Sequence, residues 1–192
     1  MALRKSNVEF AALISFGLLA IGVVLPSPSF GAAATASPLS LEWHLVTERN
    51  HDETRFTQGF AIDGEYRLES SGGFGNAYLV IEHREDDRVL ARFDLPGREF
   101  AEGATFAGEA IWLVTWRDGI ARQFNRALQV MRTVRYEGEG WGLTYDGKQL
   151  IMSDGSDRLH FRDRRDFTHS RQARVRDGDR PVHYINEMTY AH

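Results

Sequence analysis

FAEGATFAGEAIWLVTW, residues 100–116, is the stretch that decides the fold. Two short runs of apolar and β-branched residues flank the dipeptide Ala107-Gly108, and this arrangement is typical of two strands joined by a tight turn. An acidic residue, Glu102, lies five positions before the turn. The stretch therefore predicts a β-hairpin with a carboxyl group at the start of its first strand.

The same pattern recurs along the chain. Two other copies have Asp63-Gly64 and Asp146-Gly147 at the turn, and a fourth copy begins near residue 184. The equivalent positions in the four copies are Gln58, Glu102, Trp141 and Asn186, and successive ones are 44, 39 and 45 residues apart. A repeat of about 40 residues is typical of propeller blades or of helical arrays.

The content of each repeat distinguishes these two architectures. The first hairpin is followed by two more alternating stretches, residues 78–81 and 89–95, and the second by residues 121–124 and 130–136. Four short strands per repeat make one blade of a β-propeller. No window of about 12 residues beyond Pro38 carries a convincing helical stripe. The sequence therefore predicts an all-β propeller.

Composition narrows the range of functions. The chain has 192 residues, 42% apolar content and a formal net charge of −4, which suits a globular protein and gives no electrostatic field for nucleic acid. It contains no cysteine, so disulfides, thiolate metal sites and a thiol nucleophile are excluded.

The beginning of the chain has the pattern of an export signal. Arg4 and Lys5 precede an apolar run over residues 11–25, and Ala34-Thr35-Ala36 supplies small residues for cleavage. A retained membrane anchor is the alternative, but 15 residues cover roughly 22 Å against a hydrocarbon core of about 30 Å. We expect a signal peptide over residues 1–36, a propeller domain over residues 37–192, no membrane attachment after cleavage, and a periplasmic or secreted protein.

The repeat brings four chemically different side chains to equivalent positions. The inner strands of a propeller line one channel, so residues at their starts converge at one mouth. A structural role favours the same residue in every blade, whereas an amide, an acid, an indole and a second amide suit a ligand site. A merely wet and polar channel mouth is the alternative.

These residues resemble the plant- and bacterial-type glutaminyl-peptide cyclotransferases, which are five-bladed β-propellers. The matching segments are residues 56–59, 69–72, 100–103, 113–116, 140–144 with 146–147, 153–156 and 186–187. The resemblance implies that Glu102 is the catalytic acid and base, and that the substrate pocket contains Phe56, Gln58, Trp116, Trp141 and Asn186.

The resemblance also implies the activity, which is cyclisation of an amino-terminal glutamine of a peptide or protein to pyroglutamate with release of ammonia. The leaving nitrogen must be protonated, and a carboxyl group held beside two indoles would have a raised pKa suited to that transfer. The reaction needs no metal or other cofactor. A secreted propeller that binds peptide or glycan at its channel mouth without catalysis is the alternative.

The expected domain is short for this family. Five blades of about 43 residues need roughly 215 residues, whereas residues 37–192 supply 156, or about 3.6 blades. We therefore expect a truncated propeller with an exposed strand edge that invites self-association, and with weak or no activity on its own.

Overall fold

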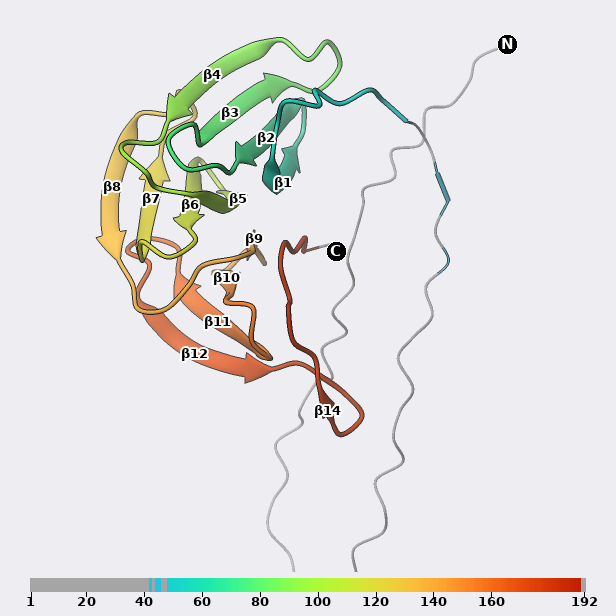
Figure 1. Cartoon of the computed structure of the whole chain (residues 1–192), viewed down its shortest axis with the longest axis vertical. Coiled ribbons are helices and arrows are strands. Elements are labelled where there is room, and N and C mark those ends of the chain that lie inside the picture. Colours follow the sequence, from blue (N-terminus) through green and yellow to red (C-terminus); the bar gives the residue numbers. More distant parts are fainter. Residues whose placement is uncertain (1–41, 43, 46–47, 191–192) are drawn as a thin grey trace, which may run out of the picture.

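The computed structural model describes residues 42, 44–45 and 48–190, and its regular structure is all-β (Figure 1). The predicted signal peptide lies outside the described residues. Three four-stranded antiparallel sheets follow one another along the chain, each in simple sequence order. Among the described residues no helix is long and apolar enough to span a membrane.

Each sheet corresponds to one predicted repeat. The first contains β1 (Thr57–Asp63), β2 (Tyr66–Ser71), β3 (Tyr78–His83) and β4 (Val89–Asp94). The second contains β5 (Ala101–Ala107), β6 (Ala110–Thr115), β7 (Ile120–Phe124) and β8 (Val130–Arg135). The third contains β9 (Leu143–Tyr145), β10 (Gln149–Ser153), β11 (Arg158–Asp163) and β12 (His169–Arg174).

The predicted hairpin turns are present between the first two strands of every sheet. Gly64, Gly108 and Gly147 have φ angles of 59°, 70° and 90°, in the left-handed region that glycine adopts without steric cost. The strands β1, β5 and β9 that enter these turns lie on the inner side of the arc in Figure 1, and β4, β8 and β12 lie on the outer side. The predicted strand order within a blade is confirmed.

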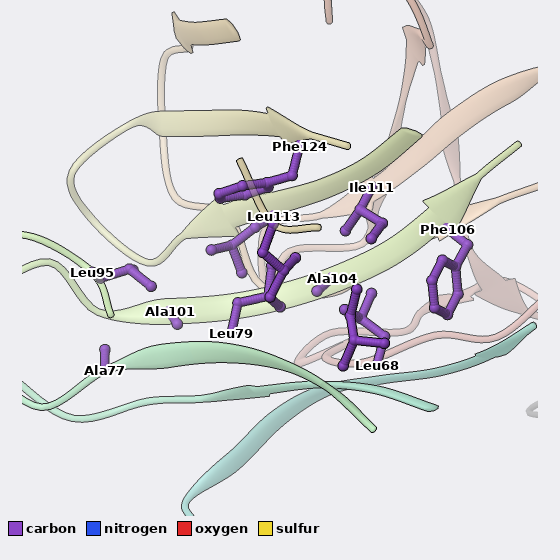
Figure 2. Close-up of a cluster of buried hydrophobic side chains, with 12 residues drawn as sticks. Leu68, Ala77, Leu79, Leu95, Ala101, Ala104, Phe106, Ile111, Leu113 and Phe124 are labelled. Atoms are coloured by element: carbon purple, nitrogen blue, oxygen red, sulfur yellow. The ribbon is translucent and has the colours of Figure 1, made fainter. Parts of the chain in front are cut away.

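The core lies between neighbouring sheets rather than within one. Leu68 and Leu79 of the first sheet pack against Leu113 and Phe124 of the second, and all four are almost fully buried (Figure 2). A second cluster joins the second and third sheets through Trp112. Full burial of one such side chain stabilises the fold by about 1.5–3 kcal/mol, so contact between blades is a main source of stability.

The fourth repeat does not begin with a strand. The third sheet is followed by a small hairpin of β13 (Arg176–Asp177) and β14 (Arg180–Pro181), and residues 182–190 are irregular. This last segment docks on the third sheet, where Met188 joins a buried cluster with Phe161. The expectation that the fourth copy begins near residue 184 with a strand is wrong for the described residues. No neighbouring strand is present there with which this segment could form a hydrogen-bonded ladder.

Buried ion pairs attach the segment before β1 to the first sheet. Glu69 and Glu82 are fully buried, and the Arg55 guanidinium donates hydrogen bonds of 2.9 Å to Glu69 and 3.0 Å to Glu82. Burial opposes ionisation of Glu82, but the hydrogen bonds from Arg55 and Arg67 leave its pKa below the usual value. Glu82 is thus held in the charged form.

Replacing Arg55 by Met should lower the free energy of unfolding by about 3–5 kcal/mol, because it leaves two buried carboxylates short of a charged partner. The loss should be largest near neutral pH and smaller in acid, where protonation of Glu82 removes the charge that Arg55 stabilises. Urea unfolding measures it, with Arg88→Met as the control because Arg88 is exposed and its contact with Asp86 is 3.7 Å long. A loss no larger than that of Arg88→Met would contradict the role given to this ion pair.

Candidate active site

The four equivalent side chains predicted from the repeat come from adjacent segments of the fold. Their positions are Gln58 in β1, Glu102 in β5, Trp141 just before β9, and Asn186 in the final irregular segment. The strands β1 and β5 are neighbours, and so are β5 and β9. The backbone N–H of Gly103 donates a 2.7 Å hydrogen bond to the carbonyl of Trp141, which ties the second anchor to the third.

A glycine follows each of the first three anchors, and it sets how closely the inner strands approach. A Cβ atom added at Gly59 would lie 2.4 Å from the backbone nitrogen of Ala104, and one at Gly103 would lie 2.3 Å from that of Leu143. One added at Gly142 would lie 2.0 Å from the carbonyl oxygen of Asn186. The glycines let backbone pack against backbone, and this packing brings the anchors together.

Two serines fix the register between neighbouring inner segments. Ser70 accepts a 2.7 Å hydrogen bond from the N–H of Gly59 and donates one to the carbonyl of Glu102. Ser153 accepts a 2.7 Å hydrogen bond from the N–H of Gly142 and donates a 2.9 Å bond to the carbonyl of Asn186. Each serine thus connects the glycine of one copy to the anchor of the next.

Glu102 is the one acid among the four anchors, and its pKa is strongly raised. The residue is 7% exposed, and its Oε2 atom is buried without a hydrogen-bond partner. Burial, and secondarily the negative charge of Glu139, raise the pKa of Glu102 to about 8. A carboxyl group with this pKa is mostly protonated at neutral pH and is able to donate a proton.

A group of aromatic side chains, the aromatic wall, lies at the start of β5, just before Glu102. The ring of Phe100 packs edge-on against Phe56 at a centroid distance of 5.9 Å, against Trp116 at 5.6 Å and against Phe74 at 5.2 Å. Phe56 and Phe74 are 60% and 57% exposed, whereas Phe100 is 8% exposed. Phe56 and Trp116, both predicted for the pocket, therefore meet through Phe100, which the prediction did not include.

Glu139 connects the two predicted tryptophans. Its Oε2 atom accepts a hydrogen bond of 2.8 Å from the indole N–H of Trp116 and one of 2.9 Å from that of Trp141. Its Oε1 atom accepts a 3.0 Å bond from Nε of Arg117, whose guanidinium lies 3.7 Å above the Trp116 ring. The hydrogen bonds from Trp141, Arg117 and Trp116 lower the pKa of Glu139, so this carboxyl is ionised.

Glu187 adds a second buried carboxyl group beside Asn186. Both of its carboxyl oxygens are buried, and burial, reinforced by Glu102, raises its pKa well above the usual value, although hydrogen bonds from the backbone of Phe60 and Leu143 act in the opposite direction. Asn186 itself is exposed, and its backbone is held by Ser153. No described group of three or more histidines and acids is arranged to hold a metal ion.

The sequence carried signals for both acids that the prediction did not include. Glu139 lies two residues before the anchor Trp141, within the repeated segment itself. Glu187 directly follows the anchor Asn186, at the position where the other three copies have glycine. Where three copies have glycine and one has a larger residue, the larger side chain must occupy space that the other copies do not provide. Here that side chain is a buried acid.

A family model described as glutamine cyclotransferase matches residues 18–192. The chain belongs to the glutamine cyclotransferase family. A glutaminyl-peptide cyclotransferase of Arabidopsis thaliana is 30% identical over 195 residues, covering 96% of this chain and 61% of that relative. The crystal structure of Myxococcus xanthus glutaminyl cyclase is 33% identical with a TM-score of 0.67, over 75% of this chain and 61% of the other.

More distant structures share the fold alone. The RRP9 WD40 repeats superimpose with a TM-score of 0.52 at 12% identity, over 66% of this chain and 40% of the other. The all-β propeller architecture predicted from the repeat is therefore confirmed. The chain spans about three-fifths of the length of its cyclotransferase relatives. The number of five blades and the roles of the predicted site residues stay predictions.

Proposed function

We propose that this glutamine cyclotransferase chain converts the amino-terminal glutamine of peptides to pyroglutamate and releases ammonia. Its membership of the family supports the reaction class. The observation that carries the proposal is the buried carboxyl group of Glu102, which has an unpartnered oxygen and a pKa of about 8 and lies two residues after Phe100 of the aromatic wall. A protonated acid in this environment suits the protonation of a leaving amide nitrogen.

The reaction is an intramolecular acyl transfer. The neutral α-amine attacks the side-chain carbonyl carbon, a new N–C bond closes the five-membered ring, and the C–N bond to the amide nitrogen breaks. Glu102 donates its proton to the departing nitrogen and takes one from the attacking amine, so ammonia leaves and the carboxyl group is regenerated. Such proton transfer by a positioned side chain contributes about 10²–10⁴-fold to the rate.

Substrate orientation is assigned to the remaining predicted residues. The extended glutamine side chain must fold back on its own amine, and the rings of Phe56, Trp116 and Trp141 would confine it in that shape. The side-chain amides of Gln58 and Asn186 would donate to the carbonyl oxygen as it gains negative charge, and would accept from the amide nitrogen.

The substrates are peptides or proteins that begin with glutamine, and the transfer belongs to the acyltransferase class. The steps above use a carboxyl group for every proton transfer, so we expect turnover to survive treatment with a metal chelator. The export signal expected over residues 1–36 would place the protein in the periplasm or outside the cell.

Ammonia release from a short peptide with amino-terminal glutamine tests the function. We expect release from this peptide, and none from the same peptide with an acetylated amine, which lacks the nucleophile. A protein that binds the glutaminyl peptide but releases no ammonia above the uncatalysed rate would support the binding alternative and contradict the proposal.

The pH dependence of kcat/KM should be a narrow bell with its maximum at about pH 8. Activity rises as the substrate amine, with a pKa of about 7.7–8, loses its proton. Activity falls as Glu102, with a pKa of about 8, loses the proton that it must donate. A peptide assay between pH 5 and 10 measures both limbs, and a rate that keeps rising beyond pH 10 would contradict the acid role of Glu102.

A further inference from the structure

We propose that Glu139 is a positioning residue that holds the indole rings of Trp116 and Trp141 and places a fixed negative charge beside the Glu102 carboxyl. The effect of Glu139 on catalysis rests on the proposed function, whereas the contacts of Glu139 with the two indoles do not depend on turnover.

One carboxylate oxygen of Glu139 holds both indoles. Oε2 of Glu139 accepts from both indoles, at 2.8 Å and 2.9 Å, and these indoles come from different blades. Trp116 follows β6 of the second sheet, and Trp141 precedes β9 of the third. A single acceptor thus fixes the rotation of two large rings relative to each other, and charge-assisted bonds of this length are stronger than neutral ones.

Other residues hold the Glu139 carboxylate and the two rings in place. Arg117 donates a 3.0 Å hydrogen bond to the other carboxylate oxygen and covers the Trp116 ring at 3.7 Å. Gly155 leaves room for the opposite indole, since a Cβ atom added there would lie 2.6 Å from the Trp141 ring. Both rings are therefore held from two sides, by a polar contact at the indole N–H and by packing on the ring.

Glu139 also places its charge close to the segment that carries Glu102. The Trp141 indole that Glu139 holds belongs to a residue whose carbonyl accepts a 2.7 Å hydrogen bond from the N–H of Gly103, directly after Glu102. Glu139 is ionised through its three hydrogen-bond donors, whereas burial raises the pKa of Glu187. A fixed negative charge disfavours a second one nearby, so the charge of Glu139 adds to burial in keeping Glu102 protonated. The residue that orients the rings therefore also helps to keep the proton on the acid.

Two substitutions separate orientation from charge. Glu139→Gln keeps a carbonyl acceptor but removes the charge, and its NH₂ group would face the Arg117 guanidinium, donor against donor. Glu139→Asp keeps the charge but is shorter by one methylene, so it should not reach both indoles. Glu137→Gln removes the same charge from an exposed position of the same loop and is the matched control.

The measurements are the indole N–H resonances of Trp116 and Trp141 and the carboxyl titration of Glu102, by NMR of the full 192-residue chain, together with kcat/KM. We expect Glu139→Asp to shift one or both indole resonances and leave the Glu102 titration nearly unchanged. Glu139→Gln should shift both indole resonances and move the Glu102 titration to lower pH. Misplaced rings should reduce kcat/KM roughly 10- to 100-fold in both variants.

Unchanged indole resonances in both variants, or the same small changes in Glu137→Gln, would overturn the positioning role. A Glu102 titration that does not move in Glu139→Gln would overturn the charge role. A chain that releases no ammonia would count against the proposed function alone, because both NMR measurements are made without substrate turnover.

Discussion

Replacing Glu102 by Gln should reduce kcat for a glutaminyl peptide by about 10²–10⁴-fold while leaving the affinity for the peptide within a few-fold. Glutamine has nearly the same shape as the protonated acid, so it fills the same buried site. It has no proton that can be given to a leaving nitrogen and taken back from an amine. The loss should therefore fall on the chemical step and not on binding.

The stability of the Glu102→Gln variant distinguishes a loss of the chemical step from a loss of folding. The folded chain raises the pKa of Glu102 from 4.5 to about 8, so folding favours the protonated acid. This contribution to stability is fully present below about pH 4.5 and is lost as pH rises towards 8. Glutamine is neutral at every pH, so Glu102→Gln should be more stable than the unmodified protein at pH 9.

Peptide titration calorimetry, single-turnover ammonia release and urea unfolding at pH 6 and pH 9 measure these effects. Glu109→Gln is the control, because Glu109 is an exposed acid at the hairpin turn of the same sheet. A Glu102→Gln variant that keeps full turnover would remove the central residue of the proposed mechanism. A variant that fails to bind peptide and is unstable at pH 9 would make Glu102 a structural residue.

Much of the fold was predictable because the repeat consists of residue patterns that determine local structure. Alternating apolar residues and turn glycines such as Gly64 and Gly108 act within a few positions, so they report strands and hairpins directly. The spacing of the anchors then placed Gln58, Glu102 and Trp141 in or directly before neighbouring inner strands. The irregular end of the chain could not be predicted this way, because a strand also depends on the neighbour with which it pairs.

The site was less predictable than the fold because its details depend on contacts between blades. Nothing local in the sequence shows that Glu139 reaches the indoles of two tryptophans that are 25 positions apart. The buried position of Glu187 likewise follows from docking of the last segment on Gly142. Side-chain orientation across a blade interface is a tertiary property, whereas the type of residue at each anchor is a sequence property.

Gly103→Ala should lower the free energy of unfolding by about 3 kcal/mol or more. The added methyl group would lie 2.3 Å from the nitrogen of Leu143, 2.6 Å from the carbon of Gly142 and 2.7 Å from the carbonyl oxygen of Trp141. All three are backbone atoms, so no side chain can rotate away to relieve the overlap. The strands β5 and β9 would have to move apart.

Such a movement would also break the connection between two proposed site residues. The 2.7 Å hydrogen bond from the N–H of Gly103 to the carbonyl of Trp141 holds the backbone beside Glu102 against the next blade. Separation of the strands would let water reach the Glu102 carboxyl and lower its pKa, because burial is the main cause of the raised value. We therefore expect lower activity together with lower stability, even for the fraction of molecules that remains folded.

Gly64→Ala is the matched control for this effect. Gly64 lies at a hairpin turn with a φ angle of 59°, and an added Cβ atom there would meet nothing within 4 Å. Its cost is backbone strain of about 1–2 kcal/mol, without any overlap between blades. Urea unfolding followed by tryptophan fluorescence compares the two variants. Equal losses would mean that the inner strands tolerate an extra methyl group, and that close backbone packing is not what brings Glu102 and Trp141 together.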